Sequence, residues 1–375
     1  MSWRMSRMSD LLEPNNLRLA FAAYNGARDL ARDLREDLSF VRTLVRSLGP
    51  GARAEPPAIA APIFAGASRF AAPALAGQRI GLVASGGSGA TAALCGVRRA
   101  FEDAGLEVAA ISACSGAALF ASLWASGLSS EEMARFWLSM RTRDYVDPDF
   151  RRLALAPLRA FRGFGGLLRG EAIERTYSRR LGPRTLGETE IPFSAVVWNI
   201  DRNRVEYLSS RSAPHMTVAR AARIAISIPL MVEPVAIGEH LYGDGGIVDI
   251  FPVEPLLDQR LDHIIGLNFY LPPDFDGEDI GPWYQRSFSI LRASGQLRYA
   301  TYLELARAHA RQLGSRLTLL HPVPFEEVRG ARFYETFLDR RRWPEFMRMG
   351  YRATRAALEQ LGRRADSAPR ALQPN

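Results

Sequence analysis

The fold of this chain is decided by residues 110–120, which read Ala110-Ile111-Ser112-Ala113-Cys114-Ser115-Gly116-Ala117-Ala118-Leu119-Phe120. The apolar run 108–111 predicts a short strand, and the small apolar run 116–124 predicts a helix directly after it. Ser115 lies at the corner between them. A strained strand-to-helix corner holds a serine hydroxyl clear of the sheet, and the N–H groups of the following helix stabilise negative charge there. This arrangement would make Ser115 a nucleophile, although small residues around a serine also suit plain helix packing.

A second feature is a glycine-rich turn after a predicted strand at residues 79–84. The turn reads Ser85-Gly86-Gly87-Ser88-Gly89-Ala90-Thr91 and leads into a helical pattern that ends at Ala104. Glycines leave backbone N–H groups accessible, so such a turn can bind a phosphate or an oxyanion. A nucleotide site would require G-x-G-x-x-G or a Walker lysine, and the chain contains neither.

A third feature is an aspartate in a glycine turn, directly after an apolar strand. This stretch is Leu241-Tyr242-Gly243-Asp244-Gly245-Gly246-Ile247-Val248-Asp249-Ile250-Phe251-Pro252-Val253. It follows the segment Ala225-Ile226-Ser227-Ile228-Pro229-Leu230.

Taken together, these stretches resemble the patatin-like phospholipase family. Its pattern is a glycine-rich loop, a G-x-S-x-G serine, an A-S-x-x-x-P segment and a D-G-G/A motif, and counterparts of all four occur here in order between residues 79 and 270. In the serine motif, Ala113 and Ala117 stand at the outer glycine positions. The resemblance implies that Ser115 is the nucleophile, Asp244 its base and the backbone of Gly86, Gly87 and Ser88 the oxyanion hole.

The resemblance also implies a three-layer α/β/α fold with a mainly parallel central sheet. The family loop often runs G-G-G-x-R-G, whereas here Ser88, Ala90 and Thr91 replace its third glycine, arginine and last glycine. These replacements bear on the geometry of the loop, and therefore on substrate and rate.

A serine hydroxyl needs a positioned base, which in many hydrolases is a histidine oriented by an acid. The histidines of this chain are His215, His240, His263, His309 and His321. Only His240 and His321 loosely suit a triad, so a histidine triad remains the alternative. The resemblance implies instead a dyad in which Asp244 accepts the proton from Ser115, with no cofactor and no metal.

Composition narrows the chemistry further. The 375 residues carry a net charge of +8, and all 48 basic residues are arginine, so a Ser-Lys dyad and a lysine Schiff base are excluded. No nucleic-acid motif is present, and no nucleic-acid partner is expected. Cys95 and Cys114 lie in apolar runs and predict buried thiols in a reducing compartment. Cys114 is an alternative nucleophile, but strand alternation should turn its side chain away from the Ser115 hydroxyl.

The N-terminal part predicts an amphipathic helix over residues 17–48. This helix could dock on the catalytic domain or on a partner, or it could bind a membrane surface. No signal-peptide core follows the first charges, and no apolar run reaches the ~18 residues of a membrane span. The expected location is therefore cytoplasmic, with or without peripheral contact with a membrane.

Residues 150–170 form a second candidate for membrane contact. They contain five arginines and no acid, interleaved with leucine and phenylalanine. The run could be a lid or a surface that meets lipid head groups. Equally, it could be a helical excursion that faces the core and has a solvated basic edge.

The predicted organisation has five parts. They are a helical segment 1–50, an Ala/Pro-rich linker 51–78, a catalytic domain 79–275, a helical extension 276–361 packed on it, and a disordered tail 362–375. Within them, strands are expected at 192–199, 204–209, 232–237, 240–243, 263–269 and 316–321. Helices are expected at 129–140, 217–228 and 283–313, and a pair of helices interrupted by Pro344 at 332–361.

The sequence thus predicts a serine lipid acyl hydrolase that cleaves glycerolipid or phospholipid esters. Two further enzymatic interpretations are hydrolysis of another insoluble ester, such as a storage polyester, and acyl transfer to an acceptor other than water. A catalytically weak, membrane-associated scaffold of the same fold is the interpretation from another class of protein.

Overall fold

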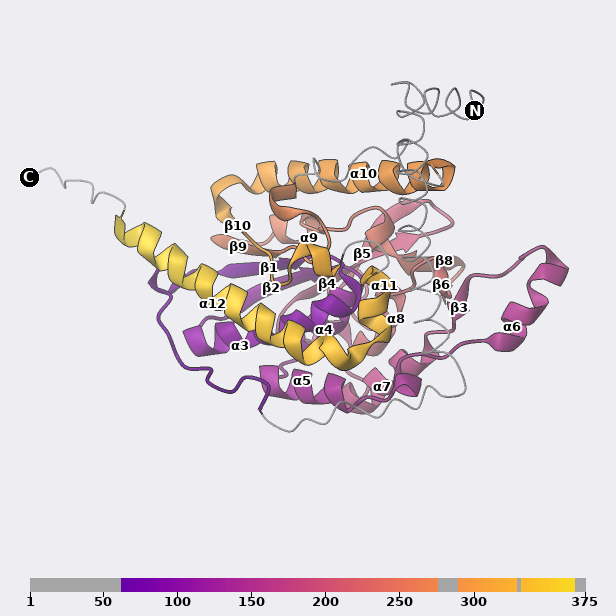
Figure 1. The fold of residues 1–375 in the computed structure, drawn as a ribbon, viewed down its shortest axis with the longest axis horizontal. Helices are drawn as coiled ribbons and strands as arrows, with labels where there is room; N and C mark the ends of the chain where they lie inside the picture. The colour runs from indigo at the N-terminus through magenta and orange to yellow at the C-terminus, as the bar shows by residue number, and fades with distance from the viewer. Residues whose placement is uncertain (1–61, 276–288, 329–331, 368–375) are drawn as a thin grey trace, which may run out of the picture.

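The computed structural model describes residues 62–275, 289–328 and 332–367. Its centre is a mainly parallel sheet with helices on both faces, so the chain has the predicted α/β fold (Figure 1). The predicted helix 17–48 and the first part of the predicted linker lie outside the described residues.

The main sheet has the strand order β10-β9-β1-β2-β4-β8-β7, and β5 also pairs with β4. Strands β10, β9, β1, β2 and β4 run parallel, whereas β5 and β8 are antiparallel to β4. The strands are β1 (Ile80–Ala84), β2 (Val108–Ala113), β4 (Phe193–Asn199), β5 (Arg204–Ser209), β7 (Val235–Ile237), β8 (His240–Asp244), β9 (His263–Leu267) and β10 (Leu317–Leu320). A separate pair consists of β3 (Gly166–Leu168) and β6 (Leu230–Val232).

Alternate residues of the central strands enter two different cores. Leu82 and Ala84 of β1 belong to the larger core, whereas Val83 between them belongs to the smaller one. Ala110 and Ile111 of β2 divide in the same way. This alternation follows from the two-residue repeat of a strand, and it gives the sheet an apolar layer on each face.

The α-helices complete the two outer layers. They are α3 (Leu94–Ala104), α4 (Gly116–Ala125), α5 (Ser130–Ser139), α6 (Phe150–Leu155), α7 (Glu171–Leu181), α8 (Val218–Ala225), α9 (Glu254–Leu257), α10 (Ser289–Leu313), α11 (Arg332–Leu338) and α12 (Trp343–Ser367). Residues of α3, α4, α5 and α12 line the larger core, and residues of α9 and α10 line the smaller one. Figure 1 shows α12 and α10 on opposite sides of the sheet.

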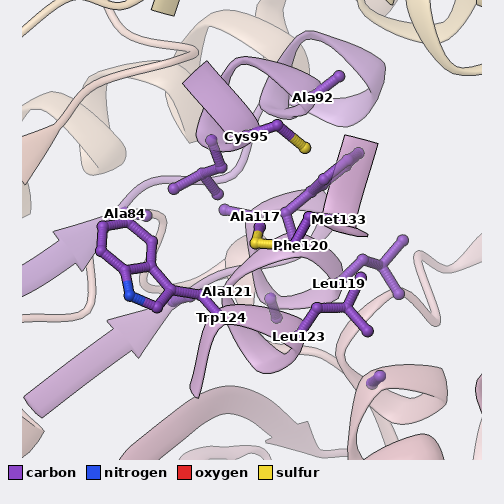
Figure 2. Packing of buried hydrophobic residues seen from close by; sticks show 14 of the residues in the cluster. Ala84, Ala92, Cys95, Ala117, Leu119, Phe120, Ala121, Leu123, Trp124 and Met133 are labelled. Atoms are coloured by element: carbon purple, nitrogen blue, oxygen red, sulfur yellow. The ribbon is translucent and has the colours of Figure 1, made fainter. Parts of the chain in front are cut away.

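Helix α4 is the innermost helix, because all ten of its residues are buried. Phe120 stacks on Trp137 with ring centroids 4.5 Å apart, and Trp124 meets Phe101 edge to face. Figure 2 shows Phe120 and Trp124 of α4 among the packed residues of the larger core. A helix that is apolar on every side is stable only in a core, so α4 gives the residue before it a fixed support.

Helix α12 packs on α3 through close backbone contact. A Cβ atom at Gly96 would lie 1.9 Å from the Met347 carbonyl oxygen, and one at Gly350 would lie 2.2 Å from the Ala93 oxygen. Only glycine permits this approach. The C-terminal helix α12 is therefore in direct backbone contact with α3, which connects β1 and β2 of the central sheet.

Two predicted boundaries differ from the structure. The division at residue 275 cuts through the sheet, because β10 lies beyond it and pairs with β9. The tail was predicted to begin at residue 362, but α12 continues to Ser367, since one glycine among helix-forming residues does not end a helix. The expected pair of helices is present as α11 and α12, but the break between them precedes Pro344, which lies in the first turn of α12, where proline is tolerated.

The described half of the predicted linker wraps around the domain. Ile63 and Phe64 are buried, and the Phe70 N–H donates to the Asp103 carbonyl over 3.2 Å. A short 3-10 helix, η1 (Pro73–Leu75), follows and buries Leu75.

Candidate active site

The strand register brings the ends of β2 and β8 together beside β4. Ala195 of β4 pairs with Ala113 of β2, and Val197 of β4 pairs with Asp244 of β8. Because β5 occupies the other edge of β4 along this length, β2 and β8 share one edge. They approach from opposite directions and end two β4 residues apart, roughly 7 Å at the rise of a strand.

Ser115 forms the turn between β2 and α4. Its backbone has φ 51° and ψ −130°, a strained conformation for a residue with a side chain. Gly116 follows, and a Cβ atom there would lie 2.5 Å from the Ser88 carbonyl oxygen. The sharp corner predicted from the sequence is therefore present, and it requires glycine after the serine because the glycine-rich loop presses against it.

Asp244 ends β8 and contacts Ser115. Its carboxylate accepts hydrogen bonds from the Ser115 hydroxyl and from the Gly246 N–H, the latter over 2.8 Å. Both side chains are buried, with 4% of Ser115 and 2% of Asp244 exposed. Burial raises the pKa of Asp244 to about 7, against the opposing effect of the two hydrogen bonds. A carboxylate with this pKa can accept a proton near neutral pH.

The glycine-rich loop lies against the same corner. A Cβ atom at Gly86 would lie 3.2 Å from the Ser115 Cβ. The Gly86 N–H, however, donates to the Ile250 carbonyl over 3.2 Å, so Gly86 provides space rather than a donor. The predicted amides of Gly87 and Ser88 have no acceptor among the described residues, and these two remain available to an oxyanion.

Ser88 begins the 3-10 helix η2 (Ser88–Ala93) with φ 52°, a left-handed conformation that favours glycine. The family loop often has glycine at this position. The Thr91 hydroxyl donates to the Ser88 carbonyl over 2.6 Å and fixes the turn. Serine is therefore accommodated here at some conformational cost, and the loop keeps a tight turn without its third glycine.

The alternative nucleophile and the alternative base lie elsewhere. Cys114 is fully buried in the smaller core, and burial raises the pKa of its thiol well above the ordinary value, which disfavours the reactive thiolate. The described polar contacts of His240 and His263 are with Asp201 and Thr318, and those of His309 are with the Phe251 carbonyl and the Asp249 carboxylate. None of these contacts involves Ser115 or Asp244. Within the described ranges, no cluster of three or more His, Cys, Asp or Glu side chains is placed to hold a metal ion.

Two residues behind the aspartate were not predicted as part of the site. The Ser227 carbonyl accepts the Asp244 N–H over 3.0 Å, and the Ser227 hydroxyl accepts a hydrogen bond from Arg223 over 2.5 Å. Arg223 is buried and also donates to the carbonyls of Arg169 and Glu233. The sequence contains one sign of this role, because Arg223 interrupts an otherwise small and apolar helix face.

The structure thus defines an α/β protein with a buried serine-aspartate contact beside a glycine-rich loop. Residues 82–257 match the family described as patatin-like phospholipase. The part of the chain that carries the site thus matches the patatin-like phospholipase family, as the sequence motifs predicted.

Two relatives and one solved structure are similar to this chain. An uncharacterized protein of Acanthamoeba polyphaga mimivirus is 34% identical over 85 residues, which cover 23% of this chain and 28% of that protein. The lysophospholipase NTE1 of Cryptococcus neoformans is 23% identical over 303 residues, which cover 76% of this chain and 17% of that protein. VipD from Legionella pneumophila aligns with a TM-score of 0.42 and 14% identity over 76% of this chain and 67% of its own.

The chain therefore spans less than a third of the length of these two relatives. The relationship to NTE1 covers most of this chain and identifies its relatives as including lysophospholipases. In the part of the chain that the structure describes, no helix combines the length and the apolar character that a membrane span requires.

Proposed function

We propose that the protein is a serine lipid acyl hydrolase that uses Ser115 and Asp244 as a catalytic dyad. The observation that carries the proposal is the hydrogen bond between the Ser115 hydroxyl and a buried carboxylate whose pKa is about 7. A serine hydroxyl is a weak nucleophile unless a neighbouring base accepts its proton. Asp244 is ionised to a substantial degree at neutral pH and is in contact with that proton.

The reaction proceeds through an acyl-enzyme. Ser115 Oγ attacks the carbonyl carbon of the ester while its proton passes to Asp244. The amides of Gly87 and Ser88 hold the resulting oxyanion, and each such donor contributes roughly 3–4 kcal/mol in related arrangements. The tetrahedral intermediate then collapses, the alcohol leaves with the proton from Asp244, and the acyl group stays on Ser115. Water activated by Asp244 releases the fatty acid.

The substrate is an ester of a glycerolipid or phospholipid. The family match and the similarity to a lysophospholipase support this class. Head group, chain length and acyl position are to be read from products, by mass spectrometry after incubation with a total lipid extract. Release of free fatty acid supports hydrolysis, whereas a new acylated product would indicate transfer to another acceptor.

A soluble ester tests the dyad without the complication of a lipid surface. Purified full-length protein is assayed on p-nitrophenyl butyrate together with Ser115→Ala and Asp244→Asn, and both variants should lose roughly 10³-fold or more in kcat. Cys114→Ala is the matched control, because it changes the adjacent buried residue and should keep most of the parental rate. Parental activity in Ser115→Ala, or loss of activity in Cys114→Ala alone, would reject the dyad.

A further inference from the structure

We propose that residues 149–165, here called the arm, dock the protein onto an anionic lipid surface. The proposal rests on the proposed lipid hydrolase function for its biological purpose, but the binding itself can be measured without catalysis. It concerns how the buried site reaches an insoluble substrate.

The arm is an ordered projection. Figure 1 shows α6 extending away from the body of the molecule, beyond β3. Asp149 closes its base, because its carboxylate accepts hydrogen bonds from the Arg152 N–H over 3.0 Å and from Arg169 Nη2 over 2.8 Å. A β-bridge between Pro148 and Leu168 lies beside this contact. The base of the arm is thus fixed by hydrogen bonds and by a β-bridge.

The surface of the arm is apolar to an unusual degree. In the described part of the chain, nine large apolar side chains are exposed, and six of them belong to the arm or to the strand paired at its base. These six are Phe150, Leu153, Leu155, Leu158, Phe161 and Leu230. Leu158 is 82% exposed, the largest value of the set. This exposure excludes the interpretation in which residues 150–170 face the core throughout. A group of exposed apolar side chains on one short segment marks an interaction site.

The charge of the arm identifies the partner. Arg152 pairs with Glu233 at the base, but Arg151, Arg159 and Arg162 have no ion pair among the described residues. Protruding apolar side chains flanked by free arginines suit the boundary between acyl chains and anionic head groups. No acid lies between residues 150 and 170, so nothing on this segment repels such a surface.

The base of the arm leads directly to the catalytic aspartate. Leu168 of β3 pairs with Val232 of β6, and β6 follows shortly after Ser227. The Ser227 carbonyl accepts the Asp244 N–H, and Arg223 donates both to the Ser227 hydroxyl and to the carbonyl of Arg169, which directly follows β3. The arm is therefore attached to the body of the molecule through segments that also hold the backbone of Asp244.

Vesicle flotation tests the docking. Binding is measured in a Ser115→Ala background, so that no lipid is consumed, to vesicles of phosphatidylcholine alone or mixed with phosphatidylglycerol. The double change Leu158→Asp and Phe161→Asp should weaken binding to the mixed vesicles by about tenfold or more, because it removes two exposed anchors and adds two acids. Leu297→Asp on α10 is the matched control, since Leu297 is 70% exposed outside the arm.

A second set of variants tests the charge. Replacing Arg151, Arg159 and Arg162 by glutamine should abolish the preference for phosphatidylglycerol. The same loss of three charges at Arg135, Arg348 and Arg352, which are exposed on α5 and α12, should leave most of that preference.

The outcomes separate the docking from the proposed chemistry. With Ser115 restored, the arm variants should hydrolyse p-nitrophenyl butyrate at the parental rate and lose activity on vesicles only. If the parent hydrolyses no ester but the arm variants still lose flotation, the docking stands and the proposed function fails. Unchanged flotation in the arm variants, or an equal loss in Leu297→Asp, would overturn the docking and leave the arm as a protein contact.

Discussion

The buried carboxylate of Asp244 accepts a hydrogen bond from the hydroxyl of Ser115, at the point where two strands of opposite direction end beside β4. Neither residue is close to the other in the sequence, so the register of β4 creates the contact. The strained turn at Ser115 and the raised pKa of Asp244 are the two physical costs of this arrangement, and each gives a measurable consequence.

The first consequence concerns pH and rate. If Asp244 is the base, only its ionised form is active, and kcat/KM on p-nitrophenyl butyrate should rise with pH along a single sigmoid whose midpoint lies near 7. Initial rates measured at several pH values between 5 and 9 check this prediction. A flat profile would show that Asp244 does not titrate in the catalytic step.

The second consequence concerns pH and stability. The raised pKa of Asp244 means that the folded state holds this proton more tightly than the unfolded state. The stability that depends on the protonated carboxyl is therefore complete below pH ~4 and is lost as pH rises through about 7. Raising the pKa from 3.8 to about 7 corresponds to roughly 4 kcal/mol at most.

Asp244→Asn should consequently unfold at higher temperature than the parent at pH 8, and the advantage should shrink toward pH 4. The exposed Asp258→Asn is the control and should show no such trend. Thermal unfolding followed by circular dichroism measures both. If Asp244→Asn is less stable than the parent at pH 8, burial of the charged Asp244 carboxylate does not destabilise the folded protein, and the prediction is wrong.

A third prediction concerns Arg223, a positioning residue. Arg223→Met removes the hydrogen bonds to Ser227, Arg169 and Glu233, and each buried acceptor left unpaired costs about 1–3 kcal/mol. We expect kcat on the soluble ester to fall about tenfold, because Asp244 is then positioned less well. KM should stay nearly unchanged, because Arg223 is not expected to contact the substrate.

Arg220→Met is the matched control for Arg223. Arg220 lies on the same helix but forms a partly exposed ion pair with Glu174, and such pairs contribute little. Its substitution should leave kcat near the parental value. Equal kcat in the parent and Arg223→Met would show that the contact to Ser227 has no part in catalysis.

A fourth prediction concerns Ser88 in the glycine-rich loop. Its φ of 52° costs a residue with a side chain about 1–2 kcal/mol and costs glycine almost nothing. Glycine also makes the unfolded chain more flexible, which offsets part of this gain. Ser88→Gly should therefore stabilise the protein by up to about 1 kcal/mol. Asn203→Gly is the control. Asn203 also has a positive φ, 50°, but asparagine adopts this conformation readily, so glycine should bring no gain there. Destabilisation by Ser88→Gly would mean that the serine side chain makes a contribution that its backbone conformation does not reveal.

The elements around the site could be predicted from local patterns. The small and apolar residues of 108–124 specify a strand, a corner and a buried helix. The helix expected at 129–140 is α5, and a capping box formed by Ser129 and Glu132 begins it. Each of these features depends on neighbours in the sequence. The sequence could therefore indicate Ser115 and the glycine-rich loop as candidates.

Features that depend on distant contacts could not be predicted in this way. The Gly86 N–H is occupied by the Ile250 carbonyl, which a glycine motif alone does not reveal. The role of Arg223 follows from three acceptors on different segments, and the pairing of β10 with β9 joins parts of the chain that periodicity separates. For the arm, the same alternation of arginine and leucine suited both a buried and an exposed segment.

Covalent labelling tests the central claim most directly. A fluorophosphonate ester reacts with an activated serine hydroxyl, and peptide mapping by mass spectrometry locates the adduct. The account predicts one adduct on Ser115, none in Ser115→Ala, and labelling slowed by roughly 10³-fold in Asp244→Asn. An adduct on another residue, or labelling of Ser115 at the parental rate without the Asp244 carboxylate, would contradict it.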